Sequence, residues 1–265
     1  MRLRALSVLG LLLATSAATC DGATEPPPDT CVEGMTMTIG TDVTGAVAGG
    51  DCDLPDGDGR VGDSYTFTLD AQSVIRFAVS GSTETGIRIR DNSRTGEQDV
   101  VLQDDGQSTY QSFVVLKAGS YTLDISADES DASGTYTVAS TVLTPPLQPT
   151  GCIQPPSQWR YAMVGVTVSG VITNGDCPGA PTFFVDSYNV RAFSAQVRKI
   201  TVTLSAGGAV EIRMKDSPAL VATPGARNTA GDIVVQFSPS TPGYYHIAII
   251  SAPGAGTVTY TIRIE

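Results

Sequence analysis

Histidine is almost missing from this sequence, and that scarcity narrows the chemistry open to the protein. His246 is the only histidine among 265 residues, and the alternating stretch "YYHIAII" predicts an outward-facing strand position for it. Neither HExxH nor GxSxG occurs, which excludes the familiar zinc peptidases and serine hydrolases. A glycosidase needs two carboxylates facing across a cleft, whereas Asp104 and Asp105 are adjacent in a turn-like segment. We therefore predict that the protein is not an enzyme; a hydrolase of unfamiliar type is the weaker alternative.

Basic residues are also scarce. The chain has 16 Lys and Arg against 27 Asp and Glu, a formal net charge of -11. Nucleic acids and anionic membrane surfaces bind clustered positive charge, so we expect neither to be a partner of this surface. Charged residues make up only 16% of the chain while glycine is abundant, a composition typical of exported β proteins.

Long apolar runs are absent except near the start of the sequence. Arg2 and Arg4 precede the apolar stretch "LSVLGLLL", and small residues follow it. This is the layout of a secretory signal, and the apolar stretch is too short to span a bilayer. We expect residues 1–19 to be a signal peptide and the protein to be exported, to the bacterial cell envelope or to the medium.

The end of this signal assigns a role to Cys20. The stretch "AATC" that ends at this residue resembles the lipobox of bacterial lipoproteins, in which the cysteine becomes the first mature residue and carries lipid. This resemblance implies a membrane anchor on Cys20. Cleavage after Ala18 is the alternative and would leave Cys20 as a free thiol. The polar, proline-rich residues 20–30 favour the anchor, because they predict an extended tether.

The rest of the chain contains two copies of one series of sequence blocks. "DVTGAVAGGDC" at 42–52 is echoed by "TVSGVITNGDC" at 167–177, and each is followed by "DSY". Further on, "AGSYTLDIS" at 118–126 matches "PGYYHIAIIS" at 242–251. Matched blocks in the same order predict a tandem duplication. The expected units are residues 31–143 and 152–265, joined by a short proline-rich linker at 144–151.

The repeat predicts how the five cysteines are used. Cys31 and Cys52 hold the same places in the first unit as Cys152 and Cys177 in the second. We predict Cys31–Cys52 and Cys152–Cys177 disulfides, each closing a loop of roughly 20 residues and worth about 3 kcal/mol. Metal ligation is the alternative, but the chain has one histidine and no CxxC. Cys20 is left unpaired, as a lipid anchor requires.

Strict alternation of apolar and polar residues predicts strands throughout both units. No segment keeps an apolar stripe of helical period. We therefore expect an all-β protein made of two tandem antiparallel β-sandwich domains, each with about seven or eight short strands. The residues predicted to face the two cores are Tyr65, Phe67, Leu69, Ile75, Phe77, Val79, Ile87, Ile89, Tyr121, Leu123, Ile125, Ile200, Val202, Leu204, Val210, Ile212, Met214, Ile233, Val235, Phe237, Tyr245, Ile247, Ile249, Tyr260, Ile262 and Ile264.

These blocks resemble a known family. "GDSYTFTL", "IRIRDNS" and "LKAGSYTLDIS" are similar to the bacterial pre-peptidase C-terminal domain over most of Asp42 to Thr141, and the second unit is a more divergent copy. Gly119 and Tyr121 form the strongest part of the motif. The resemblance implies a jelly-roll-like β-sandwich that acts as a non-catalytic accessory or binding module, in some members stabilised by calcium and in some binding polymeric substrates.

An acidic loop in the first unit is a candidate calcium site. Calcium prefers several carboxylate and carbonyl oxygens on a flexible loop, but no closing bidentate Glu stands at the expected distance here. The second unit keeps only Asp176 and Asp186 of this set. A solvated, turn-rich loop without metal is the alternative, and we predict no required cofactor. The candidate ligands are Asp51, Asp53, Asp56, Asp58 and Asp63.

Two aromatic residues beside the linker are candidates for ligand binding. Trp159 and Tyr161 would lie on one side of an extended chain, where their rings could stack on a sugar. A plug between the two domains is the alternative role. The sequence thus predicts a non-catalytic, lipid-anchored module of the cell envelope with a glycan or protein ligand. A calcium-dependent adhesion or surface-assembly component is the second hypothesis.

Overall fold

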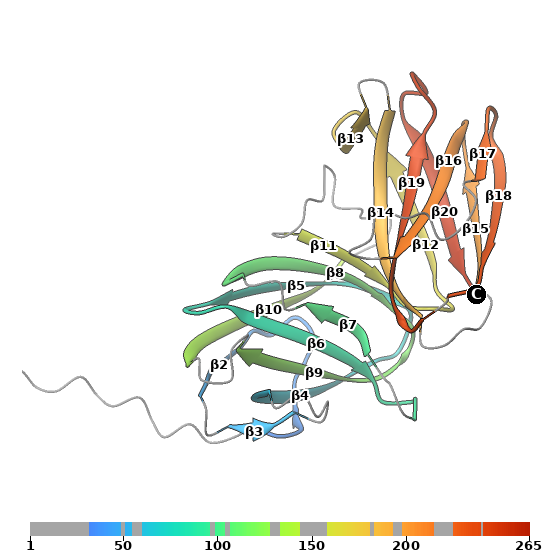
Figure 1. Ribbon diagram of the computed structural model, residues 1–265. Coiled ribbons are helices and arrows are strands. Elements are labelled where there is room, and N and C mark those ends of the chain that lie inside the picture. Colours follow the sequence, from blue (N-terminus) through green and yellow to red (C-terminus); the bar gives the residue numbers. More distant parts are fainter. Residues whose placement is uncertain are drawn as a thin grey trace, which may run out of the picture.

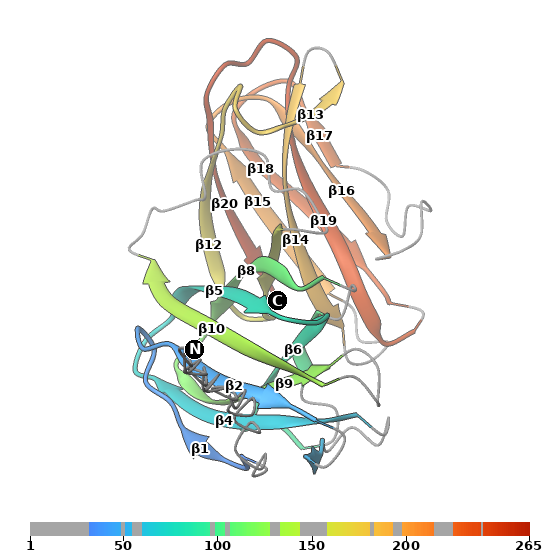
Figure 2. The same ribbon diagram turned by 90° about the vertical axis from the view of Figure 1, so that its left-hand side faces the viewer.

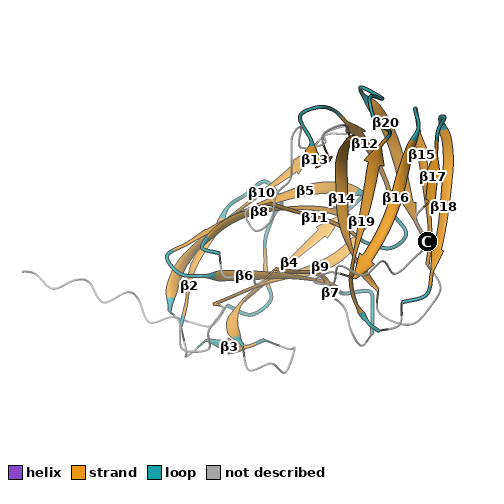
Figure 3. Ribbon diagram, turned by 45° about the horizontal axis from the view of Figure 1, so that its top comes forward, coloured by secondary structure: helices purple, strands orange, loops and turns teal. Residues whose placement is uncertain are grey.

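The computed structural model describes residues 32–48, 51–54, 60–95, 99–103, 107–127, 133–143, 158–180, 183–192, 198–214, 225–239 and 241–265. Every regular element in these ranges is a strand, as Figure 3 shows. A helix long and apolar enough to cross a membrane is not found in these ranges. The predicted all-β fold is confirmed.

The first half of the chain forms two antiparallel sheets. Its strands are β1 (Met35–Thr36), β2 (Val43–Val47), β3 (Cys52–Asp53), β4 (Val61–Leu69), β5 (Ser73–Gly81), β6 (Thr85–Asp91), β7 (Asp99–Gln103), β8 (Thr109–Leu116), β9 (Gly119–Ala127) and β10 (Gly134–Leu143). One sheet has the order β1-β4-β9-β6-β7, with β3 also beside β4, and the other has the order β8-β5-β10-β2. Only the β1–β4 pair of this half is parallel.

The second half repeats this arrangement. Its strands are β11 (Gln158–Ala162), β12 (Thr167–Ile172), β13 (Cys177–Ala180), β14 (Phe183–Ala192), β15 (Arg198–Leu204), β16 (Gly208–Met214), β17 (Gly225–Arg227), β18 (Gly231–Phe237), β19 (Gly243–Ser251) and β20 (Val258–Ile264). Every strand pairing within the first half recurs here with both strand numbers raised by ten, including the parallel pair β11–β14. The strands exceed the predicted number because β1, β3, β13 and β17 are two to four residues long, too short to show alternation.

The two halves are joined by a shared sheet (Figure 1). Strand β11 lies between β8 of the first half and β14 of the second, and it runs parallel to both. One ten-stranded sheet therefore crosses the whole molecule. Figure 2 shows the halves stacked, with β8 and β14 on either side of the boundary. The predicted linker 144–151 lies outside the described residues.

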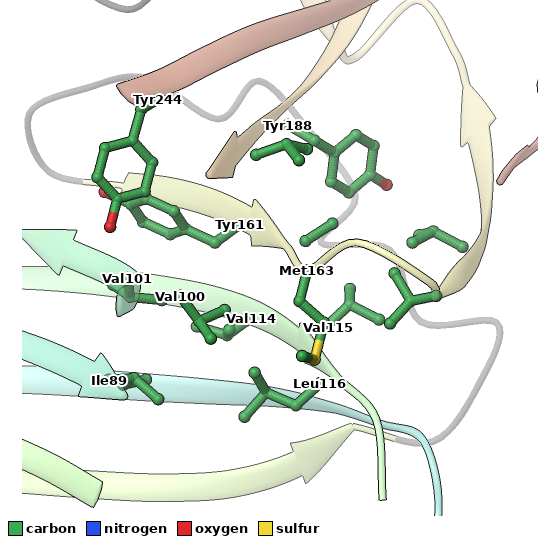
Figure 4. Close-up of a cluster of buried hydrophobic side chains, with 14 of the residues drawn as sticks. Ile89, Val100, Val101, Val114, Val115, Leu116, Tyr161, Met163, Tyr188 and Tyr244 are labelled. Carbon is green, nitrogen blue, oxygen red and sulfur yellow. The ribbon is translucent and has the colours of Figure 1, made fainter. Parts of the chain in front are cut away.

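Alternation explains the position of the core. The side chains predicted to face inward are buried, with Met214 only partly so. They form one hydrophobic cluster that extends through both halves. At the boundary, shown in Figure 4, Val114, Val115 and Leu116 of β8 are all buried, since unit two covers the strand face that would otherwise meet solvent. The halves consequently share a core as well as a sheet.

Candidate functional site

A buried aspartate and two tyrosines form a hydrogen-bonded chain inside the first half. Tyr136 on β10 donates its hydroxyl to Oδ2 of Asp63 at 2.6 Å, and its oxygen lies 2.7 Å from the hydroxyl of Tyr65. The backbone N–H of Val32 donates to Oδ1 of Asp63 at 3.0 Å. Both carboxylate oxygens are thus hydrogen-bonded, as a buried charge requires. Asp63 connects the two facing sheets with the segment that precedes β1.

The second half contains the same arrangement with one change. Tyr260 on β20 donates to Oδ2 of Asp186 at 2.8 Å and lies 2.8 Å from the hydroxyl of Tyr188. Here Oδ1 accepts a hydrogen bond from Nη1 of Arg160 on β11 instead of a backbone N–H. This ion pair is buried on both sides, with side chains 2% and 3% exposed. The strand that joins the two halves is therefore held to the second core by a buried charge pair.

A glycine makes room for each tyrosine. Gly45 on β2 is paired with Tyr136, and Gly170 on β12 with Tyr260. A methyl group on Gly45 would lie 2.5 Å from the Tyr136 hydroxyl, and one on Gly170 would lie 2.0 Å from Cζ of Tyr260. Real carbon contacts are close to 3.5–4.0 Å. Only glycine lets either ring lie across the neighbouring strand and reach the aspartate.

Burial sets the protonation of these groups. Desolvation, followed by the hydrogen bond to Asp63, raises the pKa of Tyr136, and desolvation also raises the pKa of Tyr65. Desolvation by burial also raises the pKa of Tyr260. Burial raises the pKa of Asp186, and the nearby charge of Asp176 adds to the rise, while Arg160 opposes it. The tyrosines are hydrogen-bond donors fixed in the core.

Asp51 and Asp176 each close a tight turn. Oδ2 of Asp51 accepts the backbone N–H of Ala48 at 2.8 Å, and Oδ2 of Asp176 accepts that of Thr173. In return the backbone N–H of each aspartate donates to the carbonyl of the same partner. The next residue in each repeat is a cysteine. These aspartates have the role of turn-forming residues.

Cys52 and Cys177, the cysteines that lie in the described ranges, are each disulfide-bonded. Cys31 and Cys152, their predicted partners, lie outside the described residues, as does Cys20. The pairing Cys31–Cys52 and Cys152–Cys177 therefore stays a prediction.

The candidate calcium ligands are only partly brought together. Asp63 uses both oxygens in hydrogen bonds to the protein, Asp51 uses one, and Asp53 is exposed. Asp56 and Asp58 lie outside the described residues. Within the ranges that the structure describes, no group of three metal-ligating side chains is found. A calcium site would need the loop residues together with Asp51 and Asp53, and it stays a prediction.

Tyr161 is buried at the boundary between the halves, so the predicted sugar platform is wrong at this position. Its side chain is 0% exposed, and its ring packs edge-on against Tyr244 at 5.9 Å between centroids. Figure 4 shows the two rings in contact above the valines of β7 and β8. The guanidinium of Arg191 lies 4.9 Å from the centre of the Tyr244 ring. Tyr161 is thus the plug between domains that was the alternative; the side chain of Trp159 lies outside the described residues.

His246 occupies the position that alternation predicted. It lies on β19 between buried neighbours, and its Nδ1 is 3.4 Å from Oδ1 of Asn189 on β14. Desolvation, then the nearby charge of Arg213, lowers its pKa. The imidazole is therefore neutral at physiological pH and is part of the sheet face.

Sequence reasoning missed some of the polar residues that organise the fold. Arg90 was not recognised as a structural residue, yet its Nε and Nη2 bind both oxygens of Asp124, which also accepts the hydroxyl of Ser64 at 2.6 Å. Arg160 was likewise missed. The repeat itself held a signal for Tyr136 and Tyr260. In each unit a glycine, a "DSY" block and one of these tyrosines follow one another in the same order.

No protein-family model matches the chain, and no curated protein does. Solved structures with similar arrangements include the pre-peptidase C-terminal domain of a collagenase from Bacillus anthracis, with 19% identity over 39% of this chain and 90% of that one and a TM-score of 0.31. The exported protein XepA of PBSX has 10% identity over 86% of each chain, with a TM-score of 0.24. A lectin from Pleurotus ostreatus in complex with GalNAc has 12% identity over 85% of this chain and 78% of that one, with a TM-score of 0.25.

Proposed function

We propose that this protein is a non-catalytic, lipid-anchored module of the bacterial cell envelope that holds a rigid double β-sandwich outside the cytoplasm. The observation that carries the proposal is the use of its repeated polar residues. Asp63 and Asp186, with their tyrosines, are buried in hydrogen bonds that connect sheets, and the single histidine is packed into a sheet face. These buried carboxylates, tyrosines and the imidazole therefore support a scaffold role.

The shared sheet supports a structural or binding role. Because β11 is hydrogen-bonded to both halves and held by the Arg160–Asp186 pair, the two sandwiches cannot rotate freely about the linker. A rigid body of this kind presents surfaces in a fixed relation to a tether. A glycan or a protein of the envelope is the partner class that we propose for it.

Intact mass spectrometry after expression of the full chain in a bacterial host tests the anchor. We expect a mature chain that begins at Cys20, carries the mass of two or three acyl chains and lacks four hydrogens, which corresponds to two disulfides. A Cys20→Ala variant is the matched control and should be recovered in the soluble periplasmic or secreted fraction. A wild-type chain that begins at Thr19 with a free thiol would contradict the lipoprotein.

Calcium dependence is a second candidate, and one observation favours it. Oδ1 of Asp51 is buried and receives no hydrogen bond from any described residue. An oxygen left without a donor can be satisfied by a cation. If calcium binds here, millimolar calcium should raise the melting temperature of the wild type, and Asp58→Asn should abolish the rise while the exposed Asp42→Asn does not. Equal melting temperatures with calcium and with chelator would exclude this candidate.

A further inference from the structure

The junction between the halves is formed by one strand docking on a sheet edge. In the first half, β8 is the last strand of the sheet β8-β5-β10-β2, and its outer edge is occupied by β11. The two run parallel, with Gln158 opposite Gln111, Arg160 opposite Phe113 and Ala162 opposite Val115. β11 is the first strand of the unit that follows. A unit of this fold therefore accepts, on the outer edge of its β8, the first strand of the next unit.

The same two edges are present again at the opposite ends of the molecule. β18 holds in the second half the place of β8, and it is the last strand of the sheet β12-β20-β15-β18. β1 holds in the first half the place of β11, and it is the last strand of its own sheet. Among the described residues, no strand pairs with the outer side of β18 or of β1. One end of the chain thus presents an acceptor edge and the other end presents the strand that fits it.

We propose that a second copy of this chain places its β1 on the outer edge of β18, parallel to it, and so repeats between molecules the β8–β11 junction found within one. The contact joins two different surfaces, so each added copy leaves a new β18 edge free. Copies would assemble head to tail into a row. This inference goes beyond the proposed function and does not depend on the lipid anchor.

Exposed apolar side chains mark both edges. Among the described residues, three large hydrophobic side chains are exposed: Met35 at 57%, Val234 at 53% and Val142 at 50%. Met35 lies on β1 and Val234 lies on β18. Exposed edge strands are sites of pairing with other chains, and apolar residues on them favour it. Val142 lies on β10, which is neither of the two edge strands, and supplies an internal control.

The burial of the two equivalent edge strands supports the same conclusion. β8 is buried on both faces from Ser112 to Leu116, because β11 and the second unit cover it. β18 alternates strictly, with Asp232, Val234 and Gln236 exposed. Nη1 of Arg227 donates to the carbonyl of Asp232 at 2.7 Å, at the start of the strand. The exposed side chains of β18 are those expected of an edge strand on which no further strand has docked, as β8 would be without β11.

The internal junction also predicts the register between copies. Following the pairing of β4 with β1 and of β14 with β11, Met35 corresponds to Arg160 and Glu33 to Gln158. Following β5–β8 and β15–β18, Gln111 corresponds to Val234 and Phe113 to Gln236. Glu33 of one copy would therefore lie opposite Val234 of the other, and Met35 opposite Gln236. β1 would lengthen from two residues toward the five of β11.

Sedimentation velocity of the mature protein carrying Cys20→Ser, over a range of concentrations, tests the proposal. We expect the average mass to rise with concentration through dimer to larger species. Val234→Glu should weaken association at least about tenfold, since it places like charges opposite each other at Glu33. Met35→Glu should weaken it as well, whereas Val142→Glu should leave it unchanged. All three positions are at least half exposed, so the variants should fold.

Mixing the variants distinguishes a head-to-tail contact from a symmetric one. Val234→Glu retains an intact β1, and Met35→Glu retains an intact β18, so the β1 of the first variant should dock on the β18 of the second. The mixture should therefore form a one-to-one dimer that grows no further, although neither variant dimerises alone. Dimers formed by Met35→Glu alone would show a β18–β18 contact and overturn the proposal. A wild type that stays monomeric at millimolar concentration, or equal losses with Val142→Glu, would also overturn it.

Discussion

Replacing Gly170 by alanine should be among the most destabilising single changes in the second half. The added methyl would lie 2.0 Å from Cζ and 2.2 Å from the hydroxyl of Tyr260, so the ring would have to move by about 1.5 Å to reach ordinary contact. Tyr260 is 3% exposed, so its ring is enclosed by the core. Such a shift breaks its hydrogen bonds to Asp186 and Tyr188, both 2.8 Å long. A hydrogen bond to a charged group is worth about 1.5–3 kcal/mol, and overpacking costs about 1–3 kcal/mol.

We therefore expect Gly170→Ala to lower the free energy of unfolding by about 3–5 kcal/mol. Urea unfolding followed by tyrosine fluorescence and far-UV circular dichroism measures this loss. Gly175→Ala is the matched control, because a methyl there would meet only the Thr173 hydroxyl at 3.5 Å and the change should be nearly neutral. If Gly170→Ala costs less than about 1 kcal/mol, or no more than Gly175→Ala, the close approach of Tyr260 to β12 is not what requires glycine.

Three further changes test the remaining contacts. Arg160→Met leaves the carboxylate of Asp186 buried without its partner and should cost about 3–5 kcal/mol in urea unfolding, whereas a loss below 1 kcal/mol would show that the pair contributes little. Asp176→Ala removes the acceptor of a turn N–H and should cost about 1–3 kcal/mol in the same assay, with no change expected if solvent replaces it. His246, as the only histidine, gives a single imidazole signal by NMR, and we expect its midpoint below the ordinary pKa of 6.5. Because this pKa is lowered in the folded state, its contribution to stability is present above pH 6.5 and is lost as pH falls through the lowered pKa; His246→Asn should remove that part of the pH dependence, and a midpoint at or above 6.5 would contradict the burial.

Most of the strand assignments could be made from the sequence because a sheet with one face on a core imposes a period of two. Tyr121, Leu123 and Ile125 are buried as their alternation predicted, and the same holds for Ile200, Val202 and Leu204. The short strands were missed because two to four residues carry no period. The surface position predicted for Tyr161 was wrong for a related reason. Alternation shows which residues share a side of a strand, but it does not show whether that side meets solvent or another part of the chain.

The polar networks could be predicted only in part. The repeat placed Asp63 and Asp186 at matching positions, yet it suggested metal ligation for Asp63, because a carboxylate in an acidic loop looks the same whether its partner is an ion or a tyrosine. Tyr136 is 73 residues away from Asp63 in sequence, and nothing local indicates that the two meet. Their contact depends on β10 and β4 lying on facing sheets.

By itself, the sequence determined the all-β class, the repeated order of blocks and the residues that fill the core, since each follows from local period and from comparison of the chain with itself. Only the tertiary structure decided that β11 closes the edge of β8, that the two sandwiches share one sheet, and that Arg160 anchors the joining strand to Asp186. Strand edges pair through backbone N–H and C=O groups, which every residue except proline carries. Residue types therefore do not indicate which strand edges pair, and the pairing is known only once the sheets are assembled.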